Sequence, residues 1–374
     1  MRNMKKKKKI IIILFAVGIV VLAAVGSYFF IKYQKYDYME LTKLYENNNS
    51  DNANYKQCLD GVLKYNRDGI ALLTEKGEEI WKQSCQMSHP VVDVCGDSVA
   101  VADKGGTSIM VFQKKGLKGE FQTTRPIEKF SVSSKGIVSA ILKDEEAPLV
   151  MCYDAVGNVL VEHVVSLTTM GYPMDVAISP NNGDTQIVSY LHMEDNVVKT
   201  KVAYYYFGNE DSDNKQVLQR EFEGTVMPMV SFLNNQTSAL IADNAIYIYK
   251  GLDQLEEIAK IKIANEIQSV ECGEGMIAVL TKKESNSEYK LHIYNHKGKE
   301  VTSISVDAQY AKMNVADGKI LLFDGQMCSI YNQSGICKFQ GNMEENILEI
   351  FPVRGFNKYM VISASGFREM QLAK

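Results

Sequence analysis

Five short segments that end in glycine recur along this sequence, and their spacing limits the fold more than any other feature. Each runs from an apolar or aromatic residue through a few mostly polar residues to a glycine, namely Gly77, Gly116, Gly157, Gly298 and Gly335. A tight hairpin has a left-handed position that glycine occupies without strain, so each segment predicts a turn between two strands. The glycines are 39, 41, 141 and 37 residues apart, and 141 fits three units of 47 with two degenerate copies. The repeat is therefore about 40 residues long, as in known repeat folds.

The chain between these turns consists of short strand-like runs. From Cys58 to Lys374 no convincing amphipathic helix occurs, whereas residues 98–102, 108–112 and 245–249 are apolar or alternate with period two. Four-stranded units with a period near 40 residues are typical of β-propeller blades, which close into a ring and protect their sheet edges. We expect an all-β propeller over residues 58–374. Eight blades are preferred, and seven are the alternative, because the first and last units each lack one strand and could share a blade.

The N-terminus predicts a membrane anchor. Residues 1–9 carry Arg2 and five consecutive lysines, and residues 10–31 contain no charge. These 22 residues would extend about 33 Å as a helix, enough to cross a hydrocarbon core of about 30 Å. The basic flank predicts a cytoplasmic tail at 1–9, so the bulk of the chain would be extracytoplasmic. A cleaved signal peptide is the alternative, with Ala23 and Ala24 near a conceivable cleavage site.

Residues 32–57 are polar and rich in asparagine, and we expect a linker there. Eight of the 41 basic residues precede residue 36, so the rest of the chain has 33 basic and 45 acidic residues, a net charge of −12. Nucleic-acid binding requires a basic surface, which argues against such a partner.

No group of residues predicts a catalytic, metal or cofactor site. The five histidines are mostly spread over different units. His292 and His296 are four residues apart, but that spacing stacks two ligands only on a helix, and here His296 falls in the hairpin turn that follows the strand. The acidic runs 144–146 and 210–213 lack the glycine and distal glutamate of a calcium loop. The seven cysteines form no CxxC pair, and we expect buried thiols, although Cys328 and Cys337 could face each other across a hairpin.

The first unit, residues 71–81, resembles the repeat of quinoprotein dehydrogenases and of the outer-membrane assembly propeller. Alanine, glycine and tryptophan recur there at the spacing of Ala71, Gly77 and Trp81. The resemblance implies that Trp81 packs between blades. The later units have Val161, Thr302 and Phe339 at the tryptophan position, so it does not imply a quinone cofactor.

Over nearly its whole length the chain resembles an uncharacterised family of membrane-anchored propellers from Gram-positive, clostridial-type bacteria. The segments that carry this resemblance are 67–69, 90–106, 126–129, 170–173, 179–180 and 230–235. The resemblance implies the fold and the location, and it brings no activity.

Because propellers present loops on two broad faces, we expect a non-enzymatic scaffold that binds an envelope protein or a cell-wall polymer. The alternative is an enzyme or ligand sensor whose site lies in the central channel and takes one residue from each blade. A channel site predicts converging carboxylates or histidines, whereas a scaffold predicts an exposed apolar or aromatic patch.

Overall fold

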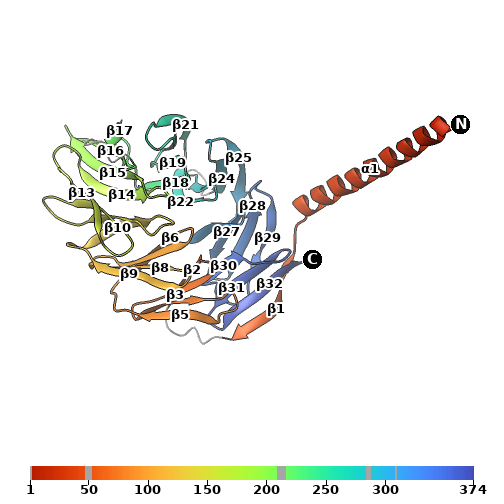
Figure 1. The fold of residues 1–374 in the computed structure, drawn as a ribbon, viewed down its shortest axis with the longest axis horizontal. Coiled ribbons are helices and arrows are strands. Elements are labelled where there is room, and N and C mark those ends of the chain that lie inside the picture. Colours follow the sequence, from red (N-terminus) through yellow and green to blue (C-terminus); the bar gives the residue numbers. More distant parts are fainter. Residues whose placement is uncertain (1, 47–52, 209–215, 284–287, 308–309) are drawn as a thin grey trace.

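Eight antiparallel sheets of four strands each are arranged in a ring (Figure 1). The computed structural model describes residues 2–46, 53–208, 216–283, 288–307 and 310–374, and the side chains of residues 2–14, 16, 24, 28 and 46 lie outside this description. The prediction of an all-β propeller with eight four-stranded blades is confirmed.

The first four blades follow the chain without interruption. Their strands are, for blade 1, β2 (Asn54–Cys58), β3 (Gly61–Tyr65), β4 (Gly69–Leu73) and β5 (Glu79–Ser84); for blade 2, β6 (Pro90–Cys95), β7 (Ser98–Asp103), β8 (Ser108–Gln113) and β9 (Gly116–Gln122); for blade 3, β10 (Ile127–Val132), β11 (Val138–Leu142), β12 (Leu149–Tyr153) and β13 (Val159–Val164); and for blade 4, β14 (Tyr172–Ile178), β15 (Thr185–Glu194), β16 (Val197–Tyr206) and β17 (Gln216–Glu223).

The other four blades repeat this order until the last. Their strands are, for blade 5, β18 (Met229–Asn234), β19 (Thr237–Ile241), β20 (Ala245–Lys250) and β21 (Glu256–Lys262); for blade 6, β22 (Glu266–Gly273), β23 (Met276–Lys282), β24 (Tyr289–Asn295) and β25 (Glu300–Val306); for blade 7, β26 (Lys312–Ala316), β27 (Lys319–Asp324), β28 (Met327–Asn332) and β29 (Cys337–Asn342); and for blade 8, β30 (Glu349–Pro352), β31 (Lys358–Ser363), β32 (Gly366–Ala373) and β1 (Tyr38–Glu46).

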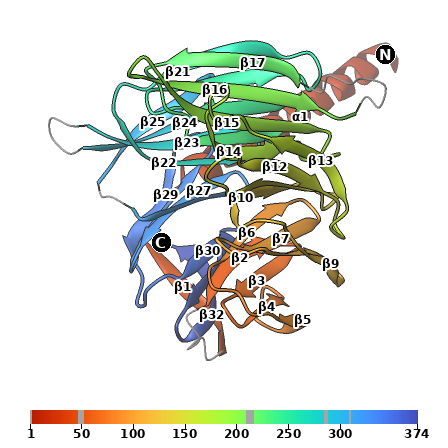
Figure 2. The same cartoon turned by 90° about the vertical axis from the view of Figure 1, so that its left-hand side faces the viewer.

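Position within a blade explains the two strand patterns of the sequence. The middle strands are covered on both faces by neighbouring blades, so β11 and β19 are buried at every residue and read as continuous apolar runs. The fourth strands lie at the outside and alternate between exposed and partly buried residues, as β5 and β25 do. First strands of successive blades contact one another, which places them around the centre of the ring (Figure 2).

The ring is closed by the N-terminal strand. β1 pairs antiparallel with β32, from Tyr38 opposite Ala373 to Glu46 opposite Gly366, and becomes the fourth strand of blade 8. The prediction of a linker over 32–57 is wrong for this strand and for β2, which supplies the strand that the first unit was expected to lack. Residues 47–52 of the predicted linker lie outside the described residues. Strand pairing between the two ends of a chain leaves no local signal, which explains the error.

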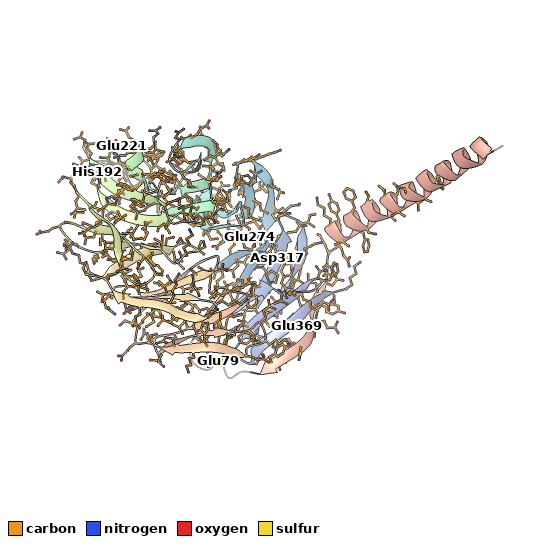
Figure 3. All side chains as sticks on the ribbon, viewed as in Figure 1. Glu79, His192, Glu221, Glu274, Asp317 and Glu369 are labelled. Carbon is orange, nitrogen blue, oxygen red and sulfur yellow. The ribbon has the colours of Figure 1, made fainter. Side chains whose placement is uncertain are left out.

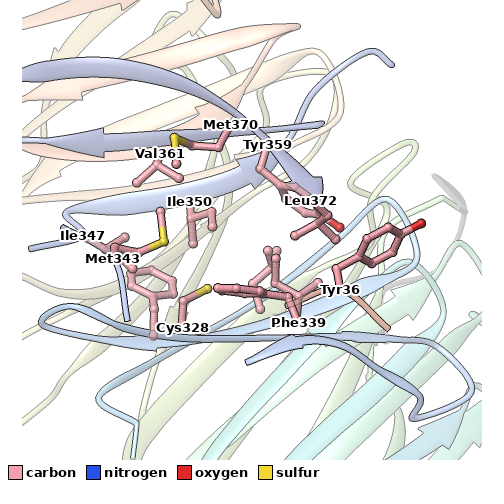
Figure 4. Close-up of a cluster of buried hydrophobic side chains, with 13 residues drawn as sticks. Tyr36, Cys328, Phe339, Met343, Ile347, Ile350, Tyr359, Val361, Met370 and Leu372 are labelled. Carbon is pink, nitrogen blue, oxygen red and sulfur yellow. The ribbon is translucent and has the colours of Figure 1, made fainter. Parts of the chain in front are cut away.

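An apolar cluster fills the junction of blades 7 and 8 and includes the residue that precedes β1. Tyr36 is 7% exposed and packs among side chains that include Phe339, Tyr359 and Leu372 (Figure 4). Its backbone N–H donates to the Lys338 carbonyl at 2.9 Å, and its hydroxyl is hydrogen-bonded to Asn357. The chain is thus fixed to the propeller before β1 begins.

Helix α1 (Arg2–Tyr33) precedes this junction and projects away from the propeller (Figure 1). The Lys338 ammonium donates hydrogen bonds to the carbonyls of Ile31, Lys32 and Gln34 at 2.7, 3.0 and 3.0 Å. These contacts cap the helix C-terminus with a positive charge, a favourable arrangement with the helix dipole. Within the part of the chain that the structure describes, no helix combines the length and apolar character that a membrane crossing requires.

Candidate functional site

The glycines singled out in the sequence lie between the third and fourth strands of blades 1, 3, 6 and 7, in the turn, and at the start of the fourth strand of blade 2. Their φ angles are all left-handed, at 82° for Gly77, 113° for Gly116, 95° for Gly157, 76° for Gly298 and 75° for Gly335. Four of these turns also share a side-chain cap, in which the first turn residue accepts hydrogen bonds from backbone N–H groups two and four residues later. The capping residues are Thr74, Asp154, Asn295 and Asn332. The fifth turn is shorter, with Gln113 directly opposite Gly116.

These glycines also allow successive blades to pack closely. A Cβ atom added to Gly157 would lie 2.5 Å from the Cβ of Phe121 in blade 2, and one added to Gly335 would lie 2.3 Å from Thr302 in blade 6. The Trp81 side chain fills the corresponding space beside Gly116 and stacks on Phe112 of blade 2, with ring centroids 4.8 Å apart and planes 6° apart. The five glycines and Trp81 therefore act in blade packing and turn geometry.

The cysteines and acidic residues considered in the sequence form no disulfide and no metal site among the described residues. All seven cysteines are free thiols, and Cys328 lies opposite Gly341 rather than Cys337. The described residues contain no group of three histidine, cysteine, aspartate or glutamate side chains that could hold a metal ion. The acidic run 210–213 lies outside the described residues.

Charged side chains interrupt the first strands of several blades and face the central channel. Asp93 of β6 accepts a hydrogen bond from the Val132 N–H of β10 at 2.7 Å, and Asp175 of β14 accepts one from the Val230 N–H of β18 at 2.9 Å. Each carboxylate thus connects its own blade to the next. The Lys129 Nζ lies 3.8 Å from the Asp175 Oδ1 and adds a weak ion pair.

Burial has a strong effect on these carboxyl groups. It raises the pKa of Asp175 to about 6, although the Val230 N–H and the Lys129 ammonium oppose the rise. Burial also raises the pKa of Asp93, Glu271 and Glu349, and in all three the nearby Lys56 charge opposes the rise. Because an uncompensated charge is costly in this environment, the channel favours protonation or a bound counter-charge.

A further carboxylate joins blades 6 and 7 at the end of the channel. Glu274 accepts hydrogen bonds from the backbone N–H groups of Asp317 and Gly318 at 2.7 and 2.6 Å. Figure 3 shows Glu274 and Asp317 lying side by side near the middle of the molecule. Backbone N–H groups satisfy this carboxylate, so it acts as a structural connection between blades.

The channel widens into a cavity of about 470 Å³ among blades 1, 6, 7 and 8. Lys56, Glu271, Lys312 and Glu349 line it, together with polar and apolar residues of the same four first strands. A site in the central channel was the alternative expectation from the sequence, but none of these residues was predicted to form it. The sequence nevertheless contains a signal for the channel. Asp93 is a single charged residue in the otherwise apolar strand β6, and such a residue is unusual unless the strand borders a channel.

A second feature lies on the outside of the ring, at the edge of blade 3. Strand β13 has valine or leucine at four of its six positions, and Val159, Leu160 and Val164 are 54%, 51% and 65% exposed. β13 pairs with β12 and has no second strand neighbour among the described strands. Natural sheet edges are commonly protected by charges or coverage, so an exposed apolar edge indicates a binding surface.

Blade 2 extends this apolar surface. Gly119 of β9 lies against the β12–β13 turn, where an added Cβ would be 2.1 Å from the Ala155 carbonyl and 2.8 Å from the Val156 Cα. The exposed side chains Leu117 and Val156 belong to these two packed segments. We call Leu117, Val156, Val159, Leu160 and Val164 the blade 3 edge.

Solved structures similar to this chain share the propeller fold at low sequence identity. BamB from Moraxella catarrhalis is 8% identical, with a TM-score of 0.51, and the alignment covers 89% of this chain and 99% of that one. The computationally designed Ika8 protein is 12% identical, with a TM-score of 0.54 and coverage of 91% and 99%. A eukaryotic initiation factor is 13% identical, with a TM-score of 0.51 and coverage of 86% and 88%.

At these identities the structural likeness shows the fold alone. No curated protein matches the sequence. A family model does match, over residues 32–372, and this range includes the strands of all eight blades apart from the last residue of β32. The chain therefore belongs to the family of unknown function DUF5711.

Proposed function

We propose that this protein is a binding scaffold that holds an extended segment of another envelope protein along the blade 3 edge. The observation that carries the proposal is the edge strand β13, in which four of six residues are valine or leucine and Glu162 is the one acidic residue. A partner strand added there would find backbone N–H and C=O groups and a row of exposed valine and leucine side chains. The edge of blade 8 supports this choice by contrast, because charged residues interrupt its outer strand β1.

We further propose that α1 holds the propeller at a membrane, with the ring on the extracytoplasmic side. The support comes from the uncharged residues 10–31 and the basic residues that precede them. Helix α1 also carries exposed apolar side chains, including Phe15, Leu22 and Phe30, on a segment that extends away from the ring (Figure 1). A scaffold held in this way would keep its partner near the membrane.

The test is site-specific photocrosslinking in cells that express the full chain. A photoreactive residue at Leu160 should crosslink to one discrete partner, and the same residue at Val301 should not. Val301 is a matched control because it is 48% exposed on β25, the corresponding outer strand of blade 6. The partner should then slow hydrogen exchange at the β13 amides when the purified proteins are mixed.

The double variant Leu160→Lys, Val164→Lys should weaken binding at least tenfold, because it places two charges on an apolar contact, whereas Val301→Lys should leave binding unchanged. Crosslinks from Leu160 only to a second copy of this chain would replace the proposal with self-association. A partner that binds the double variant as well as the natural protein would refute the blade 3 edge as its site.

A further inference from the structure

Three polar side chains of the channel cavity have no partner within the described residues. The exposed Lys56 ammonium makes no hydrogen bond or ion pair there, and neither does the partly exposed Glu271 carboxylate. The Ser269 hydroxyl oxygen is buried and has no hydrogen-bond partner. All three line the same cavity of about 470 Å³.

The other two charged side chains that line the cavity, Lys312 and Glu349, form hydrogen bonds within the protein. Lys312 donates to the Leu348 carbonyl at 2.8 Å, and the Glu349 carboxylate accepts hydrogen bonds from the Asn314 side chain and from the Ile350 backbone N–H. These contacts fix the wall between blades 7 and 8.

Lys56 and Glu271 lie near each other without forming a direct pair. The lysine charge acts on the carboxylate and lowers its pKa against the effect of burial. No ion pair within 4.0 Å joins the two side chains among the described contacts. Both side chains line the same cavity of about 470 Å³.

A cavity with one unpaired charge of each sign selects its ligand. A simple cation would be repelled by Lys56, and a simple anion would be repelled by Glu271. A molecule with a carboxylate at one end and an ammonium at the other would pair with both. The Ser269 hydroxyl could accept a further hydrogen bond from the ammonium or donate one to the carboxylate.

We propose that the channel cavity binds a small zwitterion of the amino-acid or short-peptide class, with its carboxylate on Lys56 and its ammonium on Glu271. This site lies at the centre of the ring and is separate from the blade 3 edge. Either proposal can therefore fail without the other.

The experiment uses isothermal titration calorimetry on the purified full chain with three probes: the dipeptide Ala-Ala, its N-acetyl form without the ammonium, and its C-terminal amide without the carboxylate. Ala-Ala should bind at least tenfold more tightly than either modified form, because each modification removes a charge-assisted hydrogen bond. The twenty free amino acids, titrated in the same way, extend the test to shorter zwitterions.

Two variants assign the two ends of the ligand. Glu271→Gln should lose the preference for Ala-Ala over its N-acetyl form and keep the preference over the amide. Lys56→Met should show the opposite pattern, and Lys56→Arg should restore the natural preference. Lys115→Met, at an exposed lysine in the β8–β9 turn, is the control and should bind as the natural protein does. A variant that merely disturbed the fold would weaken all three probes together.

Three results would overturn the proposal. The first is that none of these probes binds at millimolar concentration, which would mean that the cavity holds only water. The second is that the N-acetyl dipeptide binds as well as Ala-Ala, which would identify an anion site. The third is that both variants keep both preferences, which would place the ligand elsewhere on the protein.

Discussion

Blade 3 and blade 8 are both four-stranded, but they obtain their fourth strand in different ways. Blade 3 takes all its strands from one continuous stretch, ending in the apolar edge strand β13. Blade 8 takes its outer strand from the N-terminus, whereas its other three strands come from the opposite end of the chain. The outer strand β1 includes Glu40 and Lys43 among its charged residues, whereas β13 carries one acidic residue.

The difference separates two uses of a sheet edge. At blade 8 the chain itself supplies the missing strand, and the Tyr36 contacts and the Lys338 cap fix that strand and helix α1 in place. At blade 3 the local sequence completes the sheet and leaves its apolar edge uncovered. The outer strand of blade 8 thus contributes to closure of the ring, whereas the blade 3 edge is the surface that we propose for binding.

Removal of β1 should have the largest effect. Deletion of residues 38–46 leaves blade 8 with three strands and uncovers β32 and part of the apolar cluster between blades 7 and 8. We expect loss of cooperative thermal unfolding and a tendency to aggregate, measured by circular dichroism and light scattering. The double variant Leu160→Lys, Val164→Lys changes the outer strand of blade 3 and should keep a cooperative transition. Cooperative unfolding of the deletion variant at the natural temperature would show that β1 is dispensable for closure.

Within the continuous blades, Gly157→Ala should be much more damaging than the same substitution at a left-handed glycine with open space around it. It places a Cβ 2.5 Å from the Cβ of Phe121 at a residue whose φ is 95°. Overpacking and the left-handed conformation together should cost about 3 to 4 kcal/mol of unfolding free energy. Gly105→Ala is the matched control, because Gly105 has a φ of 82° and open space around its added Cβ, so only about 1 kcal/mol is expected. Equal losses in chemical denaturation would contradict the close packing of blades 2 and 3.

Asp175 should make stability depend on pH on the side of the channel near blade 3. Its pKa is about 6 in the folded protein and about 3.9 in an unfolded chain, so the folded state binds more protons between these values. The unfolding free energy should therefore fall as the pH rises from about 4 to about 6, by up to about 3 kcal/mol from this group. Asp175→Asn should remove this part of the slope and be the more stable protein at pH 7. The unfolding free energy of each protein is measured by chemical denaturation at several pH values. If it depends on pH in the same way in both proteins, Asp175 has an ordinary pKa in the folded state.

Removal of a single tyrosine hydroxyl should have the smallest effect on the unfolding free energy. The change should be a loss at the blade 7–8 junction and no change or a gain in blade 3. Tyr36→Phe loses the hydrogen bond to Asn357 at the blade 7–8 junction and should cost about 1 kcal/mol. Tyr153→Phe in blade 3 removes a buried hydroxyl that has no partner among the described residues, so it should leave stability unchanged or raise it by about 1 kcal/mol. Differential scanning calorimetry of the two variants beside the natural protein measures both changes. A loss for Tyr153→Phe as large as that for Tyr36→Phe would indicate a partner for the Tyr153 hydroxyl.

The sequence by itself determined the features that depend on neighbouring residues. The glycine turns and their spacing identified repeated four-stranded units, and the count of these units favoured eight blades. Trp81 was assigned to blade packing by its resemblance to other propeller repeats. These predictions depended on turn geometry and on burial patterns within one hairpin, which act over a few residues.

Only the tertiary structure decided which distant segments meet. It paired residues 38–46 with β32, where the sequence analysis expected a linker, because strand pairing depends on a partner that local composition does not reveal. It also brought Lys56 of the first blade to the same cavity as Ser269 and Glu271 of the sixth. A ring places its first and last blades side by side, so contacts between the ends of the chain follow from closure of the fold.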